Sequence, residues 1–342
     1  SIDYSEIQRF SDEQSVVGLV AAGLEHVVDV KIPKEEVLQF VGQALQLEQR
    51  NQAMNKFVAG LVEKLRQMDV YSLLLKGQGI AQCYERPLWR SSGDVDLFLS
   101  EDNYYKAKSV LMPLASNVEE ENDYTKHFGM TINSWEVELH GYLRSELYKK
   151  IDRELDKVKD DVFFGGNVRS WQNGQAQIFL PGANNDAVYI FTHILQHFFK
   201  GGIGLRQICD WCRLLWTYKD SIKCDLLEKR IRKMGLMSEW RAFAALAVDT
   251  LGMPSDAMPL YSDSSKWSRK GKKVLESVLE TGNMGHNRDL SFRQETGTVV
   301  RKWKTFCHIT SDTFKQFSIF PVDSIRVWCG MMKNGILSLF GK

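Results

Sequence analysis

Two aspartates separated by one residue are the strongest candidates for chemistry in this chain. Asp94 and Asp96 lie in the run Gly-Asp-Val-Asp-Leu-Phe-Leu, where acidic and apolar residues alternate as in a strand. Both carboxylates should leave one face, with Val95 and Leu97 on the other. Neighbouring ionised carboxylates repel each other unless a cation neutralises them. The pair therefore favours a hard divalent cation such as Mg²⁺ (or Mn²⁺) that also binds phosphate, although exposed acidic pairs without metal are common.

A third carboxylate can come from the run Trp135–His140, where Glu136 and Glu138 alternate on an expected second strand. If this strand neighbours the first, Glu138 completes a cluster of three; if Glu138 points elsewhere, Glu136 becomes the candidate. Such a cluster can hold two metal ions about 3.5–4 Å apart that activate an attacking oxygen and stabilise a departing one. His140 shares a face with Glu138, so it either meets substrate or a carboxylate, or is a half-buried strand histidine.

A glycine turn precedes the acidic pair. The apolar run Tyr71–Leu75 is followed by Lys76, Gly77 and Gln78, and a helix is expected to start at Ile80–Tyr84. A turn between a strand and a helix places backbone N–H groups where a phosphate can sit, although glycines also end strands for steric reasons. A phosphate held there would contact Lys76, Gly77 and Gln78, and the Lys76 amine either binds it or merely closes the turn.

The loop that leads into the acidic strand carries further polar residues. Arg86, Arg90, Ser91 and Ser92 are placed to meet a triphosphate. We assign Arg90, Ser92 and the adjoining Gly93 to nucleotide binding. Ordinary loop exposure is the alternative for the arginines.

The order of these motifs resembles the nucleotidyltransferase superfamily (DNA polymerase beta-like), and within it a bacterial family of uncharacterised nucleotidyltransferases. The superfamily pattern is an apolar strand, a Gly-Gly or Gly-Ser turn, an acidic D-x-D or D-x-E strand and a later carboxylate. The turn here is Lys76-Gly77, which departs from that pattern and fits the bacterial family. The resemblance covers about residues 40–250 and is carried by Leu75-Lys76-Gly77, Arg90-Ser91-Ser92-Gly93-Asp94-Val95-Asp96 and Val137-Glu138-Leu139-His140.

The resemblance implies roles for these residues. Asp94 and Asp96 would bind the metals, Glu138 would orient or deprotonate the acceptor, and Gly77 with its neighbours would hold the terminal phosphates. The implied reaction moves a nucleoside monophosphate from a nucleoside triphosphate to an unknown acceptor, with pyrophosphate leaving. A small molecule or sugar is the first expectation for the acceptor, and a protein side chain the second. The alternatives are a catalytically silent nucleotide-binding or interaction module and a structural cation site.

Two further histidines lie one helical turn apart. His193 and His197 have the i, i+4 spacing that can clamp a metal, but no third ligand follows nearby in sequence. The alternatives are a helix face that lines a substrate cleft and plain packing. With His140 and Arg206, we list them as candidate residues of a substrate cleft.

The pattern of apolar residues predicts an α+β fold, in which a small mixed-sheet nucleotidyltransferase core lies between two helical regions. We expect an N-terminal helical region at 1–69, the core at 70–183 and a C-terminal helical domain at 184–342. A break is expected in the first region near Gln49–Gln52, because an unbroken helix of that length would be unusual. In the last region, Leu226–Leu251 has continuous helical spacing.

Composition narrows the class of protein. Hydrophobic residues make up 44% and charged residues 25%, as in soluble globular proteins, and no apolar run reaches the roughly 18–20 residues of a membrane span. Cys209 and Cys212 form a C-x-x-C without a second pair, so we expect ordinary buried thiols and a cytoplasmic location.

Charge is unevenly distributed along the chain. Residues 266–342 carry 14 Lys/Arg against 6 Asp/Glu, whereas residues 1–265 carry 30 against 37. Nucleic acid is an unlikely partner, because the half with the acidic cluster would repel a phosphate backbone. The basic, amphipathic C-terminal segment, with Ile325, Trp328 and Met332 on its apolar face, is expected to pack on the core or on a partner.

Overall fold

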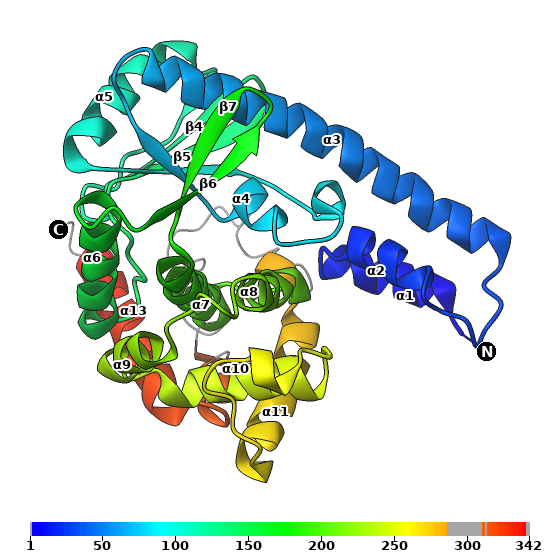
Figure 1. Cartoon of the computed structure of the whole chain (residues 1–342). Coiled ribbons are helices and arrows are strands. Elements are labelled where there is room, and N and C mark those ends of the chain that lie inside the picture. Colours follow the sequence, from blue (N-terminus) through cyan, green and yellow to red (C-terminus); the bar gives the residue numbers. More distant parts are fainter. Residues whose placement is uncertain (1, 286–309, 312, 340–342) are drawn as a thin grey trace. The chain divides into compact units, whose positions relative to one another are not determined.

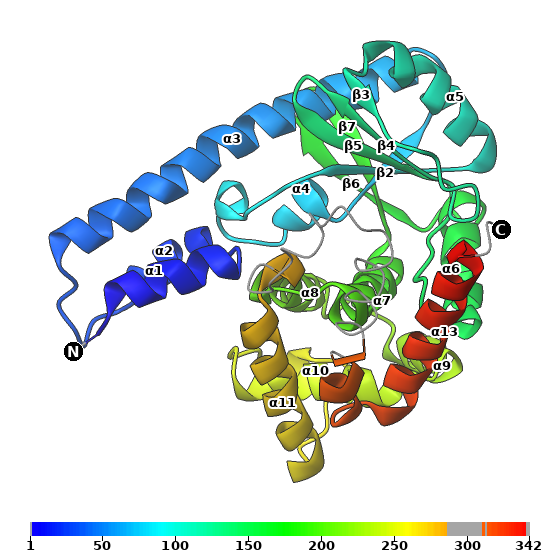
Figure 2. The same ribbon diagram turned by 180° about the vertical axis from the view of Figure 1, so that it is seen from behind.

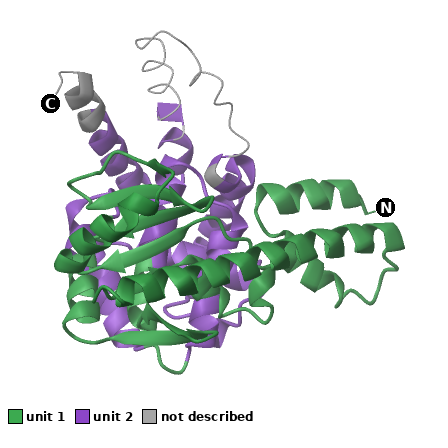
Figure 3. Cartoon of the chain, turned by 90° about the horizontal axis from the view of Figure 1, so that it is seen from above, with its two compact units in different colours: residues 1–144, 155–189, 220–222 green, residues 145–154, 190–219, 223–342 purple. Residues whose placement is uncertain are grey.

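The computed structural model describes residues 2–285, 310–311 and 313–339 (Figure 1). The part of the basic C-terminal segment at 286–309 lies outside them. Two compact units divide the chain (Figure 3): the first comprises 1–144, 155–189 and 220–222, and the second 145–154, 190–219 and 223–342. The predicted boundaries at residues 69 and 183 stay a prediction.

The first unit is built on one seven-stranded mixed sheet, which confirms the α+β prediction (Figure 1 and Figure 2). The strand order is β3-β4-β5-β2-β1-β7-β6, with β2 parallel to β5, β1 parallel to β7 and the other neighbours antiparallel. The strands are β1 (Ser72–Leu75), β2 (Val95–Leu99), β3 (Asn117–Val118), β4 (His127–Ile132), β5 (Trp135–His140), β6 (Val168–Asn173) and β7 (Ala176–Pro181).

Apolar side chains on one face of this sheet form the core of the unit. Val95, Leu97 and Leu139 are at most 1% exposed and pack with residues of the helices α3 (Lys34–Arg66) and α5 (Glu101–Leu111). Burying each such side chain contributes about 1.5–3 kcal/mol, so the alternation in β2 determines which face turns inward. The acidic residues are thereby held on the opposite face. The helices of the unit are α1 (Tyr4–Glu13), α2 (Val17–Leu24), α3 (Lys34–Arg66), α4 (Gly77–Ala81), α5 (Glu101–Leu111), η1 (Pro87–Trp89) and η2 (Met112–Leu114).

Helix α3 is unbroken, so the predicted break near Gln49–Gln52 was wrong (Figure 1). Its N-terminal half is covered by α2, where Phe40 and Ala44 pack against Val17. Its C-terminal half packs on the sheet through Met54 and neighbouring residues. A helix of this length is stable because tertiary packing covers its apolar face along both halves. The spacing of apolar residues in the sequence indicates a helix but does not show how far it continues without a break.

The second unit is helical, with a core of aromatic rings. Phe191 lies 5.3 Å from Trp211 and 4.7 Å from Trp240, measured between ring centroids. Helices α6 (Lys149–Phe163) and α7 (Ala183–Lys200) contribute residues to both units. The remaining elements are α8 (Leu205–Thr217), α9 (Cys224–Met234), α10 (Met237–Asp249), η3 (Ser255–Ala257), α11 (Ser265–Thr281), η4 (Asn283–Gly285) and α13 (Pro321–Leu339).

The predicted helical stretch Leu226–Leu251 is two helices, which corrects the sequence-based expectation. Gly235 ends α9 with φ of 78°, a left-handed conformation that glycine adopts without a steric penalty. The thiols of Cys209 and Cys212 are free, and burial raises the pKa of both, that of Cys209 to about 12. Among the helices that the structure describes, none has the length and apolar character needed to span a membrane.

Candidate functional site

The three predicted carboxylates come together at neighbouring strands. Asp94 directly precedes β2, Asp96 lies on β2, and Glu138 lies on β5 as the register partner of Asp96. Carboxylate oxygens of all three lie within 4.8 Å of one another. Glu136 is exposed and accepts a hydrogen bond of 2.9 Å from Thr131. The third member of the cluster is therefore Glu138, as expected from the alternation in that strand.

The negative charges of this cluster are only partly compensated by hydrogen bonds and cationic groups of the protein. The charge of Asp96, followed by burial, raises the pKa of Asp94 above its ordinary value. Asp96 is 1% exposed, and within the described part of the chain its Oδ2 atom is buried without a hydrogen bond. A buried, unpaired carboxylate oxygen beside a repelling neighbour is the environment that a divalent cation stabilises. The residues present thus fit a metal ion.

Lys76 and His140 contact the other oxygen of Asp96. Oδ1 lies 3.1 Å from Nζ of Lys76 and 2.8 Å from Nε2 of His140. Burial alone would lower the pKa of both groups, but the pKa of Lys76 is raised by Asp96 and the other nearby acidic groups, and that of His140 by hydrogen bonds to Asp96 and Glu138. In the protein without metal, the Lys76 ammonium therefore offsets part of the negative charge, and His140 makes a hydrogen bond to the same oxygen.

Lys76 lies in the predicted glycine turn with an unusual backbone. Its φ and ψ are 48° and −140°, a region that residues with a Cβ rarely adopt. Gly77 follows with φ of 42°, and a Cβ added to it would lie 3.4 Å from the carbonyl oxygen of Asp94. The turn thus lies directly against the acidic strand, with a lysine where the superfamily pattern has glycine. Holding lysine in this conformation costs roughly 1–3 kcal/mol.

The Gln78 side chain turns toward helix α3. Gln78 is 2% exposed, and its Nε2 donates a hydrogen bond of 2.9 Å to Oδ1 of Asn51. Nδ2 of Asn51 donates in turn to the carbonyl oxygens of Leu88 and Arg90, at 2.7 and 2.8 Å. Only the backbone of Gln78 is left to meet a phosphate. Asn51 joins the glycine turn to the loop at residues 85–93, which contains Arg86 and Arg90 and is called the arginine loop below. The sequence signalled Asn51 only as a polar residue on the buried face of a helix.

The arginine loop is organised by its own residues. Arg90 is 3% exposed, and its Nη1 donates to the carbonyl oxygen of Ser91 at 3.0 Å and to Oγ of Ser92 at 2.9 Å. Gly93 is exposed, and a Cβ added to it would meet nothing within 4 Å. Arg86 pairs with Glu25 through two contacts of 2.6 and 2.7 Å. The predicted contacts of Arg90, Ser92 and Gly93 with nucleotide stay a prediction.

Two residues near the cluster had no assigned role in the sequence-based prediction. Nε2 of His127 lies 3.0 Å from Oε2 of Glu138, because His127 pairs with His140 across β4 and β5. Burial would raise the pKa of Glu138, but hydrogen bonds from His127 and His140 hold it below its usual range. Tyr189 of α7 is close enough to Lys76 that each affects the pKa of the other.

The remaining predicted cleft residues belong to the second unit. His193 and His197 lie on successive turns of α7 with ring centroids 4.5 Å apart, and Arg206 lies in the first turn of α8. Their assignment to a substrate cleft stays a prediction.

The family model described as uncharacterised nucleotidyltransferase matches residues 1–252, about three quarters of the chain. The chain belongs to this family. No curated protein and no solved structure matches the chain. Membership confirms the resemblance inferred from the motifs and extends it from residue 40 to residue 1. The carboxylate cluster, the turn and the arginine loop all lie within the matched region, so the class of activity is nucleotidyl transfer.

Proposed function

We propose that this protein moves a nucleoside monophosphate from a nucleoside triphosphate to a small acceptor, with Mg²⁺ (or Mn²⁺) held by Asp94, Asp96 and Glu138. The convergence of these carboxylates on two paired strands carries the proposal. Family membership supports the use of a nucleoside triphosphate. An oxygen of the acceptor forms a bond to the α-phosphorus, and the bond from that phosphorus to pyrophosphate breaks.

Each side chain has a defined task in this proposal. The divalent metal, when bound, neutralises the triphosphate and stabilises the charge that develops on the leaving group. The Lys76 ammonium donates to phosphate oxygens in place of Asp96, and the backbone of Gly77 admits the phosphates because it has no Cβ. Glu138 holds the metal and either orients the acceptor or accepts the proton that the acceptor oxygen loses.

The acceptor is inferred from charge alone. Residues 1–265, which include the cluster, carry 30 Lys/Arg against 37 Asp/Glu, so a polynucleotide acceptor would be repelled. A small molecule or a sugar meets no such penalty, and a protein side chain is the second candidate. The rival is a silent module that binds nucleotide without transfer. It gives no reason for keeping three mutually repelling carboxylates beside the glycine turn.

A thermal-shift screen of the four nucleoside triphosphates tests the proposal. At least one should raise the melting temperature only when Mg²⁺ is present, because a ligand of the folded state stabilises it by mass action. Asp94→Asn should abolish this shift, and pyrophosphate release with an acceptor should fall by several orders of magnitude. An Asp94→Asn protein that binds Mg²⁺-nucleotide as well as wild type would refute the metal role. Binding without pyrophosphate release across a panel of acceptors would favour the silent module.

A further inference from the structure

A second cluster of ligand-type side chains shares Glu138 with the acidic one. His127 and His140 are direct partners across the antiparallel pair β4–β5, and Glu138 lies on the same face two residues before His140. Nε2 of His127 is 3.0 Å and Nε2 of His140 is 3.4 Å from one atom, Oε2 of Glu138. One ligand atom from each of the three lies within 4.8 Å of the other two. Nε2 of His127 is thus directed at this carboxylate oxygen, and Nε2 of His140 lies between it and Oδ1 of Asp96, which is 2.8 Å away.

These separations suit a small metal ion. Ligand atoms that lie about 2.0–2.2 Å from one ion are roughly 3.0–3.5 Å apart at tetrahedral or octahedral angles. The two distances to Oε2 of Glu138, 3.0 and 3.4 Å, fall in this range. Imidazole nitrogen suits Zn²⁺ and related transition ions, whereas Mg²⁺ takes oxygen ligands. The donor set differs in kind from the all-carboxylate cluster beside it.

We propose that His127, Glu138 and His140 bind a Zn²⁺-class transition metal ion. This site is adjacent to the cation site on Asp94 and Asp96 and shares Glu138 with it. The pair of sites would hold two chemically different ions. Zinc binding here requires no nucleotide and stands independently of the proposed transfer reaction.

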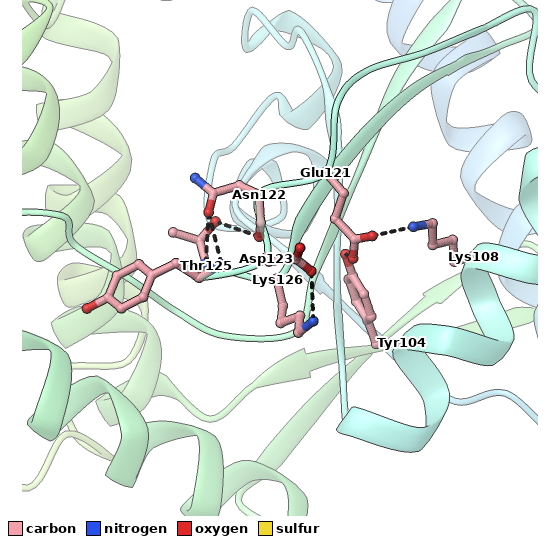
Figure 4. A network of polar contacts seen from close by, with 8 residues as sticks. Tyr104, Lys108, Glu121, Asn122, Asp123, Thr125 and Lys126 are labelled. Atoms are coloured by element: carbon pink, nitrogen blue, oxygen red, sulfur yellow. Dashed lines mark hydrogen bonds and ion pairs between the residues drawn. The ribbon is translucent and has the colours of Figure 1, made fainter. Parts of the chain in front are cut away.

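The cluster is accessible and held in place. The side chains of His127 and Glu138 are each 31% exposed and that of His140 is 13% exposed, so an ion can reach them from solvent. The loop before His127 is fixed by polar contacts (Figure 4): Tyr104 donates a hydrogen bond of 2.7 Å to Glu121, and Oδ1 of Asn122 accepts from two backbone N–H groups. A ligand at the start of β4 is thereby positioned before any ion arrives.

The strand position opposite Glu138 is covered by a further acidic side chain. Gly129 is the register partner of Glu138, and a Cβ on Gly129 would overlap the carboxylate of Glu119. The absence of a side chain there lets Glu119 lie over the strand on the face that carries the cluster. Its negative charge adds to the attraction of this face for a cation.

Calorimetric titration of the full-length, metal-stripped protein with Zn²⁺, in millimolar Mg²⁺ and without nucleotide, tests the proposal. Wild type should bind one Zn²⁺ through these residues, and His127→Gln should weaken that binding at least tenfold, because glutamine keeps a hydrogen bond to Glu138 but lacks an imidazole ligand. His193→Gln is the matched control, since His193 and His197 are the other close histidine pair in the described residues. This control should bind Zn²⁺ like wild type. His127→Ala provides a second variant, and each protein's melting temperature without metal checks that it folds.

Three outcomes overturn the proposal: no Zn²⁺ binding by wild type, equal binding by wild type and His127→Gln, or loss of binding in His193→Gln alone. Equal binding would mean that His127 only positions Glu138 by a hydrogen bond. Asp94→Asn separates the two proposals, because it should lose the Mg²⁺-nucleotide shift and keep Zn²⁺ binding. If wild type fails to bind Zn²⁺ but its melting temperature still rises with Mg²⁺-nucleotide, the zinc proposal is wrong and the proposed function is unaffected.

Discussion

At the scale of single residues, Asp94 and Asp96 differ although they look equivalent in sequence. Asp96 is paired with Lys76 and His140, whereas the charge of Asp96 is the main cause of the raised pKa of Asp94. A group whose folded pKa is raised stabilises the fold at low pH, and that contribution is lost as the pH rises through the folded value. At neutral pH an ionised Asp94 therefore opposes folding.

Replacing each aspartate by asparagine should reveal this difference. Asp94→Asn should leave the metal-free protein at least as stable as wild type, because the repulsion disappears. Asp96→Asn should cost roughly 1–3 kcal/mol, since Lys76 loses its carboxylate partner. Urea unfolding of both variants without metal measures the two effects. Equal losses in both would show that Asp94 makes a stabilising contact that offsets the repulsion.

The strained backbone at Lys76 predicts a difference between two ways of removing its charge. Lys76→Met loses the ammonium and keeps the strain, while Lys76→Gly loses the ammonium and adopts φ of 48° freely. The glycine variant should therefore unfold with a free energy about 1–2 kcal/mol higher than that of the methionine variant. Both should lose the Mg²⁺-nucleotide shift. Equal stability of the two variants would show that the backbone at residue 76 changes to an unstrained conformation when the lysine is replaced.

At the scale of elements, packing of α2 against η1 depends on one glycine. A Cβ on Gly18 would overlap the backbone carbonyl oxygen of Trp89, which a side-chain rotation cannot relieve. Gly23, on the same helix, has nothing within 4 Å of an added Cβ. The residues on either side of Trp89 are also held by helix α3, because Asn51 of α3 donates hydrogen bonds to the carbonyl oxygens of Leu88 and Arg90.

Alanine at these two glycines should have opposite effects. Gly18→Ala should destabilise the protein by about 1–3 kcal/mol through overpacking. Gly23→Ala should stabilise it by up to about 1 kcal/mol through helix propensity. Thermal unfolding of the two variants measures the contrast. If Gly18→Ala behaves like Gly23→Ala, then α2 is not held against η1 in solution.

At the scale of the whole molecule, each unit has its own core, and the second contains a buried acidic pair. Glu239 of α10 is 1% exposed, and Asp323 of α13 is 6% exposed and accepts a hydrogen bond of 2.9 Å from Tyr148. Burial, and then the hydrogen bond and charge of Asp323, raise the pKa of Glu239 to about 9 from 4.5. Glu239 is therefore protonated in the folded protein at neutral pH.

The raised pKa makes global stability depend on pH. The folded state binds the Glu239 proton more tightly than the unfolded chain, so its contribution is complete below about pH 4.5 and is lost as the pH rises through about 9. Across that window, wild type should lose stability relative to Glu239→Gln, which stays neutral. Urea unfolding of both proteins from pH 5 to pH 9 measures the difference. Parallel pH profiles would show that Glu239 is ionised in the folded state.

The acidic site was predictable because its signals are local. Two-residue spacing alone determines that Asp94 and Asp96 leave one face and that Val95 and Leu97 enter the core. The turn at Gly77 and the run that ends at His140 were also recognisable within a few residues. Strand β6 was not found from sequence, because its alternating exposed and half-buried residues resemble a loop until they pair with β7. Strand β7 was also missed, although most of its residues are buried.

Only the tertiary structure decided which distant residues meet. The register of β2 with β5 places Asp96 beside Glu138, and the register of β4 with β5 adds His127. Packing of α3 brings Asn51 to the turn and the loop, across 27 residues to Gln78 and 39 to Arg90. Such contacts depend on which apolar faces are buried against each other. The spacing of residues within each strand would be the same if the strands paired in another order, so this spacing cannot select the pairing. The sequence determined the kinds of groups and the faces that carry them, and burial of the core determined their partners.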